Sequence, residues 1–114
     1  MAFSSGCTAL VIGGAAAIGG AYFYKGEIKA SYPVSIQHLY DVTLYTFQED
    51  GIKVISVKNT KYNADIVGKL NNGDEIKVHI NYNDESLATY GIRIGYIGDE
   101  QRSRNMLLRF EQYI

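Results

Sequence analysis

A single cysteine is the residue best suited to covalent chemistry. Cys7 is the only thiol in the 114-residue chain, so no internal disulfide can form. A catalytic thiolate needs a base or a cation nearby, and no histidine, lysine or arginine precedes Lys25. Cys7 also stands beside glycine and serine, outside any amphipathic element, which argues against a place in the core. Covalent modification of the Cys7 thiol is therefore the remaining chemical role to consider.

The two histidines and the adjacent carboxylates predict no active site. His38 falls off the apolar stripe of a predicted helix, and His79 falls on the polar face of a predicted strand. No cysteine or carboxylate stands at metal-ligand spacing from either. The pairs Asp84–Glu85 and Asp99–Glu100 lie at predicted turns, where neighbouring side chains point apart. We therefore predict no catalytic residue, no metal, no cofactor and no enzymatic activity.

The segment from Gly95 to Gly98 has the composition of an anion-binding loop before a helix. Helix N-termini attract phosphate, but Asp99 and Glu100 occupy the position that an anion would take. Aspartate is a preferred N-cap, and glutamate favours the positive end of the helix dipole. Helix capping is therefore the better interpretation.

Residues 1–24 carry no charged side chain and are assigned to an N-terminal anchor or tether before a soluble domain at 25–114. About 20 apolar residues span a bilayer as a helix, although the glycines in this stretch weaken a helix. A secretory apolar region is normally preceded by basic residues, which are absent. Gly-rich segments are typical of linkers. Three interpretations remain open: a transmembrane helix, a secretory region, or lipid attachment at Cys7 followed by a tether.

Several short motifs together resemble a known family. They are SGC at 5–7, YFYKGE at 22–27, YPVS at 32–35 and IRIGYIGDEQRS at 92–103. In this order they resemble a family of small bacterial lipoproteins of unassigned function that includes a virulence-associated lipoprotein of Francisella. The resemblance extends from Cys7 to about Tyr113 and implies an α+β fold.

The resemblance implies a location as well as a fold. Cys7 would be the lipidated first residue of the mature protein, and the membrane would be a partner through that lipid. Two acyl chains already make a stable anchor. Thr8 after the cysteine would suit an outer-membrane lipoprotein facing the periplasm or the surface. Ser4 departs from the family pattern, because an apolar residue usually stands three positions before the cysteine.

Alternation and turn signals predict an α+β domain, a five-stranded antiparallel sheet with two helices on one face, in the order β-α-β-β-β-β-α. The first helix is capped by Ser35 and ended by Gly51, and the second is capped by Asp99. The apolar run at 52–58 suggests a central strand, and NNGD at 71–74 is a strong hairpin signal.

Tyrosine is unusually frequent, with ten residues, and seven are predicted on inner faces: Tyr32, Tyr40, Tyr62, Tyr82, Tyr90, Tyr96 and Tyr113. Ordinary core packing, with each buried hydroxyl finding a partner, is the preferred interpretation. The alternative is a pocket for a small hydrophobic ligand between sheet and helices. Its predicted lining is Tyr40, Phe47, Tyr90, Ile92, Tyr96, Met106 and Phe110.

Composition bears on the class of partner that the chain can bind. The net charge of −1 argues against nucleic acid, which requires a concentrated basic face. We expect a monomeric soluble domain on a lipid-anchored envelope protein, which binds or organises a protein partner at the membrane surface. The alternative is a carrier or sensor of a small hydrophobic ligand.

Overall fold

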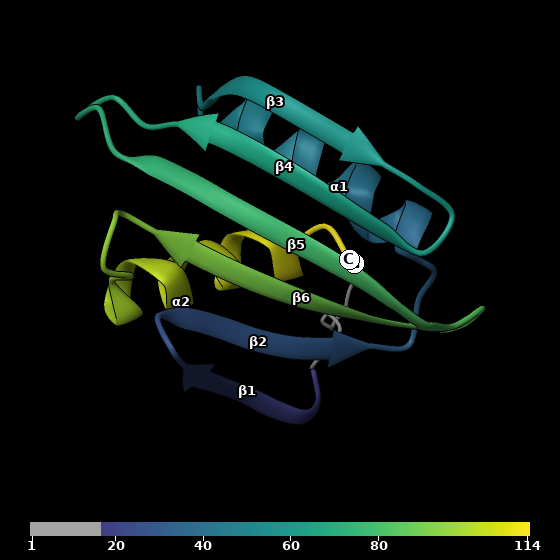
Figure 1. Cartoon of the computed structure of the whole chain (residues 1–114). Helices are drawn as coiled ribbons and strands as arrows, with labels where there is room; N and C mark the ends of the chain where they lie inside the picture. The colour runs from purple at the N-terminus through teal and green to yellow at the C-terminus, as the bar shows by residue number, and fades with distance from the viewer. Residues whose placement is uncertain (1–16) are drawn as a thin grey trace, which may run out of the picture.

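A computed structural model describes residues 17–114 and shows an antiparallel sheet with two helices on one face (Figure 1). The elements are β1 (Ile18–Tyr24), β2 (Glu27–Tyr32), α1 (Ile36–Glu49), β3 (Lys53–Asn59), β4 (Asn63–Lys69), β5 (Glu75–Asp84), β6 (Leu87–Ile94) and α2 (Glu100–Glu111). The six strands lie in the order β1-β2-β6-β5-β4-β3. The predicted α+β class and the two helices are confirmed.

The prediction of five strands is wrong, because β1 adds a sixth. This strand lies within the uncharged segment 1–24 and pairs with β2, with Phe23 opposite Ile28. Lys25 and Gly26 both have positive φ, at 49° and 84°, as a two-residue hairpin turn requires. The strand escaped prediction because Gly19 and Gly20 interrupt the alternation that marks a strand.

The apolar run at 52–58 is also not the central strand it was predicted to be. β3 lies at the edge of the sheet and pairs with β4 alone. Its register shifts between Val54 and Ser56, where Ile55 is an extra residue without a partner on β4. All seven of its residues are exposed. The apolar run therefore forms an exposed edge strand and not a strand buried on both faces.

Both helices begin where the sequence predicts. The Ser35 hydroxyl accepts a hydrogen bond from the His38 amide at 3.1 Å, and the Asp99 carboxylate accepts one from the Arg102 amide at 3.0 Å. These contacts satisfy amide groups that a helix N-terminus leaves unpaired. The cap at Asp99 confirms the structural interpretation of the segment after Gly98.

Aromatic rings fill the space between the sheet and the helices. Phe110 of α2 stacks on Tyr90 of β6, with ring centroids 5.2 Å apart, and lies 6.1 Å from Phe47 of α1. Tyr32 meets Tyr90 edge-on at 5.9 Å. One ring therefore contacts both the sheet and the other helix, and such pairs add stability beyond the area they bury.

Both buried tyrosines have partners for their hydroxyl groups. Tyr90 donates to the Leu39 carbonyl at 2.9 Å, and Tyr32 donates to Glu111 Oε2 at 2.6 Å. Burial raises the pKa of both phenols well above the ordinary value, and the Glu111 carboxylate adds to the effect at Tyr32. Both therefore keep their protons at neutral pH and act as hydrogen-bonded core residues.

Replacing Phe110 with alanine tests the importance of this ring. We expect Phe110→Ala to lower the free energy of unfolding by about 3–5 kcal/mol, because it removes contacts with two elements and leaves a cavity. Leu108→Ala on the same helix is the control, since that side chain is exposed, and we expect a change within about 0.5 kcal/mol. Urea unfolding of the two variants checks this; equal losses would contradict the assigned core.

Candidate functional site

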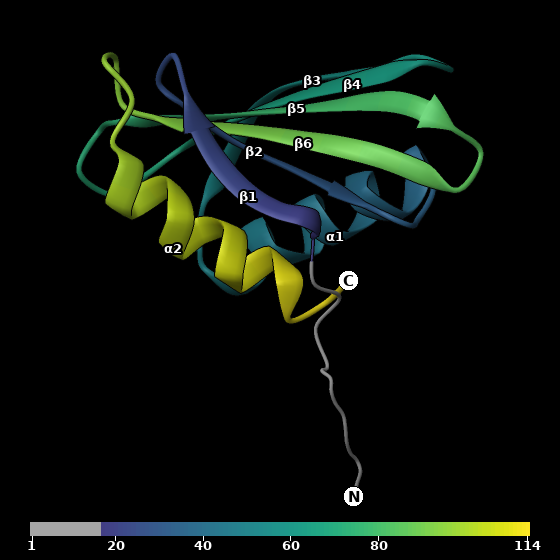
Figure 2. The same cartoon turned by 90° about the horizontal axis from the view of Figure 1, so that it is seen from below.

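Two loops from distant parts of the sequence meet at one end of the sheet. They are the β1–β2 turn at Lys25–Gly26 and the β6–α2 loop at 95–98. Figure 2 shows both projecting at this end, beside the start of α2. Both loops belong to the motifs YFYKGE and IRIGYIGDEQRS. The structure therefore brings these two motifs together.

Glycines allow the two loops to approach closely. Gly26 and Gly98 have φ of 84° and 94°, values that side-chain-bearing residues rarely adopt. A Cβ added to Gly98 would lie only 2.6 Å from Gly26 Cα, and one added to Gly26 would lie 2.9 Å from the Ile97 carbonyl oxygen. Backbone therefore packs on backbone here, with no space for a methyl group.

Arg93 of β6 joins the same two loops through hydrogen bonds. Its guanidinium donates to the Lys25 carbonyl at 2.8 Å, and to the carbonyls of Tyr96 and Ile97 at 3.3 and 3.4 Å. Charged donors form the stronger class of hydrogen bond. The Asp99 amide also donates to the Ile94 carbonyl at 2.9 Å, which closes the second loop at its base. The loop backbone is thus held at several points.

Large apolar side chains project from this fixed backbone. Tyr96 is 98% exposed and Ile97 is 85% exposed, and the outward-facing Tyr22 and Tyr24 of β1 are more than half exposed. We call these four residues the aromatic rim. Exposed apolar residues at a fixed position lose little conformational freedom on binding, and tyrosine is enriched among the residues that dominate protein interfaces. The rim therefore combines exposed apolar side chains with loops whose backbone is closely held.

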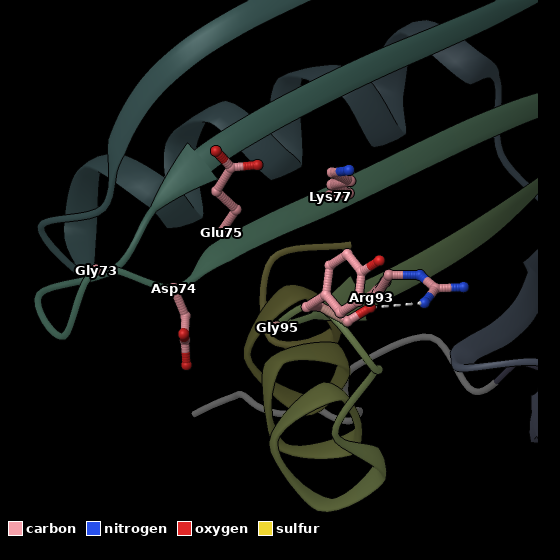
Figure 3. Close-up of a pocket in the computed structure, with 7 residues that line it drawn as sticks. Gly73, Asp74, Glu75, Lys77, Arg93 and Gly95 are labelled. Carbon is pink, nitrogen blue, oxygen red and sulfur yellow. Dashed lines mark hydrogen bonds between the residues drawn. The ribbon is translucent and has the colours of Figure 1, made fainter.

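A shallow hollow of about 400 Å³ adjoins the rim on the outer face of the sheet (Figure 3). Lys77 and Arg93 stand directly opposite each other on β5 and β6, and Glu75 lies two residues before Lys77. These three side chains line the hollow together with Gly73, Asp74, Gly95 and Tyr96. Because charges of both signs line it, the hollow suits polar groups of a partner better than an apolar ligand.

The predicted pocket residues do not all lie together. Phe47, Tyr90, Ile92 and Phe110 are buried in the common core, while Tyr40 and Met106 pack at its edge, half-buried. The aromatic members of the buried set contact one another, so their own rings occupy the space that a ligand would need.

Tyr96 lies outside this group, and its predicted place on an inner face is wrong. β6 ends at Ile94, and Gly95 with φ of 82° turns the chain out of the strand. Tyr82 does lie on the predicted face, opposite the buried Ala88, but it and Tyr62 are exposed and contact each other edge-on at 5.5 Å. The glycines at 95 and 98 were the signal that the strand had ended.

Most of the other polar residues considered for chemistry have structural partners. His79 bonds Asp65 across two strands of the outer face, and His38 bonds the Ile114 carbonyl at 3.0 Å. Asp84 accepts from the Ser86 amide at 2.8 Å, and Glu100 pairs with Arg104. Within residues 17–114, no three histidine, cysteine or carboxylate side chains gather in a way that could hold a metal ion.

The N-terminal predictions fall largely outside the described residues. Cys7, with its predicted lipid, lies there. No helix between residues 17 and 114 is both long and apolar enough to cross a membrane.

Comparison with known families identifies the chain at the family level. Residues 1–112 match the family described as "Protein of unknown function (DUF3568)". The chain belongs to this family. No curated protein matches the DUF3568 chain. Membership of a family of unassigned function is therefore confirmed.

Substitution of Gly98 tests whether close packing fixes the loops. We expect Gly73→Ala to cost about 1–2 kcal/mol, because φ is 93° and the added methyl meets nothing within 4 Å. Gly98→Ala has the same backbone cost, and we expect about 1–3 kcal/mol more because the methyl collides with Gly26. Denaturant unfolding measures both. Equal costs would show that the two loops do not depend on each other.

Proposed function

We propose that this DUF3568 protein is a non-enzymatic, lipid-anchored protein of the bacterial envelope whose domain binds a protein partner through the aromatic rim. The observation that carries the proposal is the near-complete exposure of Tyr96 and Ile97 on a loop held by Arg93 and the two glycines. A loop without a binding role would have little reason to combine a fixed backbone with exposed apolar side chains.

The direction of β1 supports this arrangement. The strand begins at Ile18, and its far end leads into the turn beside the rim. The bulge between Ile18 and Tyr22 shortens the strand, so it lies along Glu27–Ser31 of β2, which span roughly 14 Å. A tether that enters the sheet at Ile18 therefore joins the domain at the opposite end of β1 from the rim (Figure 1). A domain anchored in this way would present the rim away from its own membrane, toward a protein partner.

The lipid at Cys7 and the outer-membrane location rest on the resemblance to bacterial lipoproteins and on the uncharged segment around the cysteine. A role in virulence would follow from the same resemblance. The alternative of a hydrophobic-ligand carrier gains no specific support, because the rings predicted to line its pocket pack on one another.

Mass spectrometry of the protein isolated from native membranes tests the anchor. We expect a chain that begins at Cys7 and carries acyl groups on that residue, and a Cys7→Ser variant that leaves the membrane fraction because it lacks the acylated thiol. Recovery of an unmodified Cys7 thiol, with residues 1–6 still present, would contradict lipid anchoring.

Cross-linking and affinity purification of the full chain from native membranes test the rim. We expect the double variant Tyr96→Ser/Ile97→Ser to recover the stoichiometric partner at least 10-fold less well, since a loss of about 1.4 kcal/mol gives that factor. The control Tyr62→Ser/Leu108→Ser removes two similarly exposed apolar side chains elsewhere. Recovery that is unchanged in both, or reduced equally, would exclude the rim as the contact.

A further inference from the structure

A second surface lies at the opposite edge of the sheet from β1. β3 pairs with β4 on one side and has no strand on its other side among residues 17–114. An edge strand presents backbone N–H and C=O groups that can bond to another extended chain. All seven residues of β3 are exposed, so access to this edge is open.

The side chains of β3 differ between its two faces. Val54 and Val57 lie opposite Gly68 and Ile66 of β4, and so they extend the apolar face that the helices cover. Both remain more than one-third exposed, as does Ile55 at the register shift. The opposite face carries Lys53 and Lys58. An added strand would therefore meet an apolar row on one face and a basic row on the other.

The charge of this hairpin is strongly unbalanced. Residues 53–69 contain Lys53, Lys58, Lys61 and Lys69 against Asp65 alone, although the whole chain has a net charge of −1. None of the four lysines forms an ion pair within the described part of the chain. The arginines of α2, in contrast, pair with carboxylates. The free positive charge of the domain is thus concentrated beside its open edge.

We propose that β3 binds an extended segment of a partner protein in which acidic and apolar residues alternate. The segment adds to the sheet as a neighbour of β3, through main-chain hydrogen bonds that provide affinity. Its apolar side chains cover Val54 and Val57, and its carboxylates face Lys53 and Lys58. This site is separate from the aromatic rim, and it does not depend on the lipid anchor.

Charge selects such a segment over a second copy of the chain. Edge lysines and irregular register are common protections against pairing between identical sheets. Pairing of two copies through β3 would bring two hairpins of net charge +3 together. An acidic segment meets attraction at the same positions. The lysines that oppose self-association therefore favour the acidic partner.

Titration of the isotope-labelled full chain with a capped heptapeptide of alternating glutamate and valine tests the proposal. We expect amide chemical-shift changes concentrated in β3 and β4, slower hydrogen exchange at β3, and a Kd in the millimolar range or tighter. Shifts that are absent, or that concentrate at the rim, would overturn it. So would a dimer that forms through β3, because a second copy would then be the occupant.

Charge reversal gives the second arm of the test. We expect Lys53→Glu/Lys58→Glu to weaken binding of the glutamate–valine peptide at least 10-fold and to gain binding of the matching lysine–valine peptide. The control Lys29→Glu/Arg104→Glu reverses two charges on β2 and α2, away from this edge and outside the hollow, and should retain the original preference. If both double variants lost affinity for the glutamate–valine peptide equally, the net charge of the chain would explain the loss. That result would overturn a binding site at β3. Neither result depends on the rim variants.

Discussion

Pairing between β2 and β6 is the interaction on which the remaining structure depends. These strands are about sixty residues apart, and their ladder joins the N-terminal hairpin to the four-strand meander. Its register places Ile28 opposite Ile92, so the turn before β2 arrives beside the loop after β6. Because a shift of one residue would exchange the two faces of the strand, the same ladder buries Tyr32 and Tyr90 and aligns Gly26 with Gly98. The pairing of β2 with β6 therefore positions both the core tyrosines and the loops that carry the rim.

The sequence predicted the structure correctly at helix caps and in strands whose apolar residues are the buried ones. Ser35 and Asp99 act as caps, and the inward residues of β4 and β5 alternate as predicted. It failed where glycines change the backbone: Gly19 and Gly20 concealed β1, and Gly95 ended β6 before Tyr96. Position within the sheet was also hidden, since the apolar run of β3 is compatible with either a centre or an edge. The rim depends on contacts between distant loops, which local patterns do not encode.

The described domain divides into side chains that hold the fold together and side chains that remain exposed. Its polar side chains are largely engaged in caps, turns and cross-strand pairs, and its buried phenols have hydrogen-bond partners. The features without a role in folding are exposed: the aromatic rim beside β1 and the basic, apolar edge of β3. The rim is formed by β1 and the loop after β6, and the other surface lies along β3, so the two surfaces share no residue.

The course of β1 also determines how the domain would carry mechanical load. A partner holding the rim and a tether entering at Ile18 would pull along the axis of this strand, in opposite directions. Hydrogen bonds of an antiparallel pair run perpendicular to the strands, so such tension shears the whole β1–β2 ladder together and does not open it one bond at a time. At the far end, Arg93 and the glycine contact resist slippage of the turn. An edge strand with few neighbours would thus serve as the force-bearing link between membrane and partner.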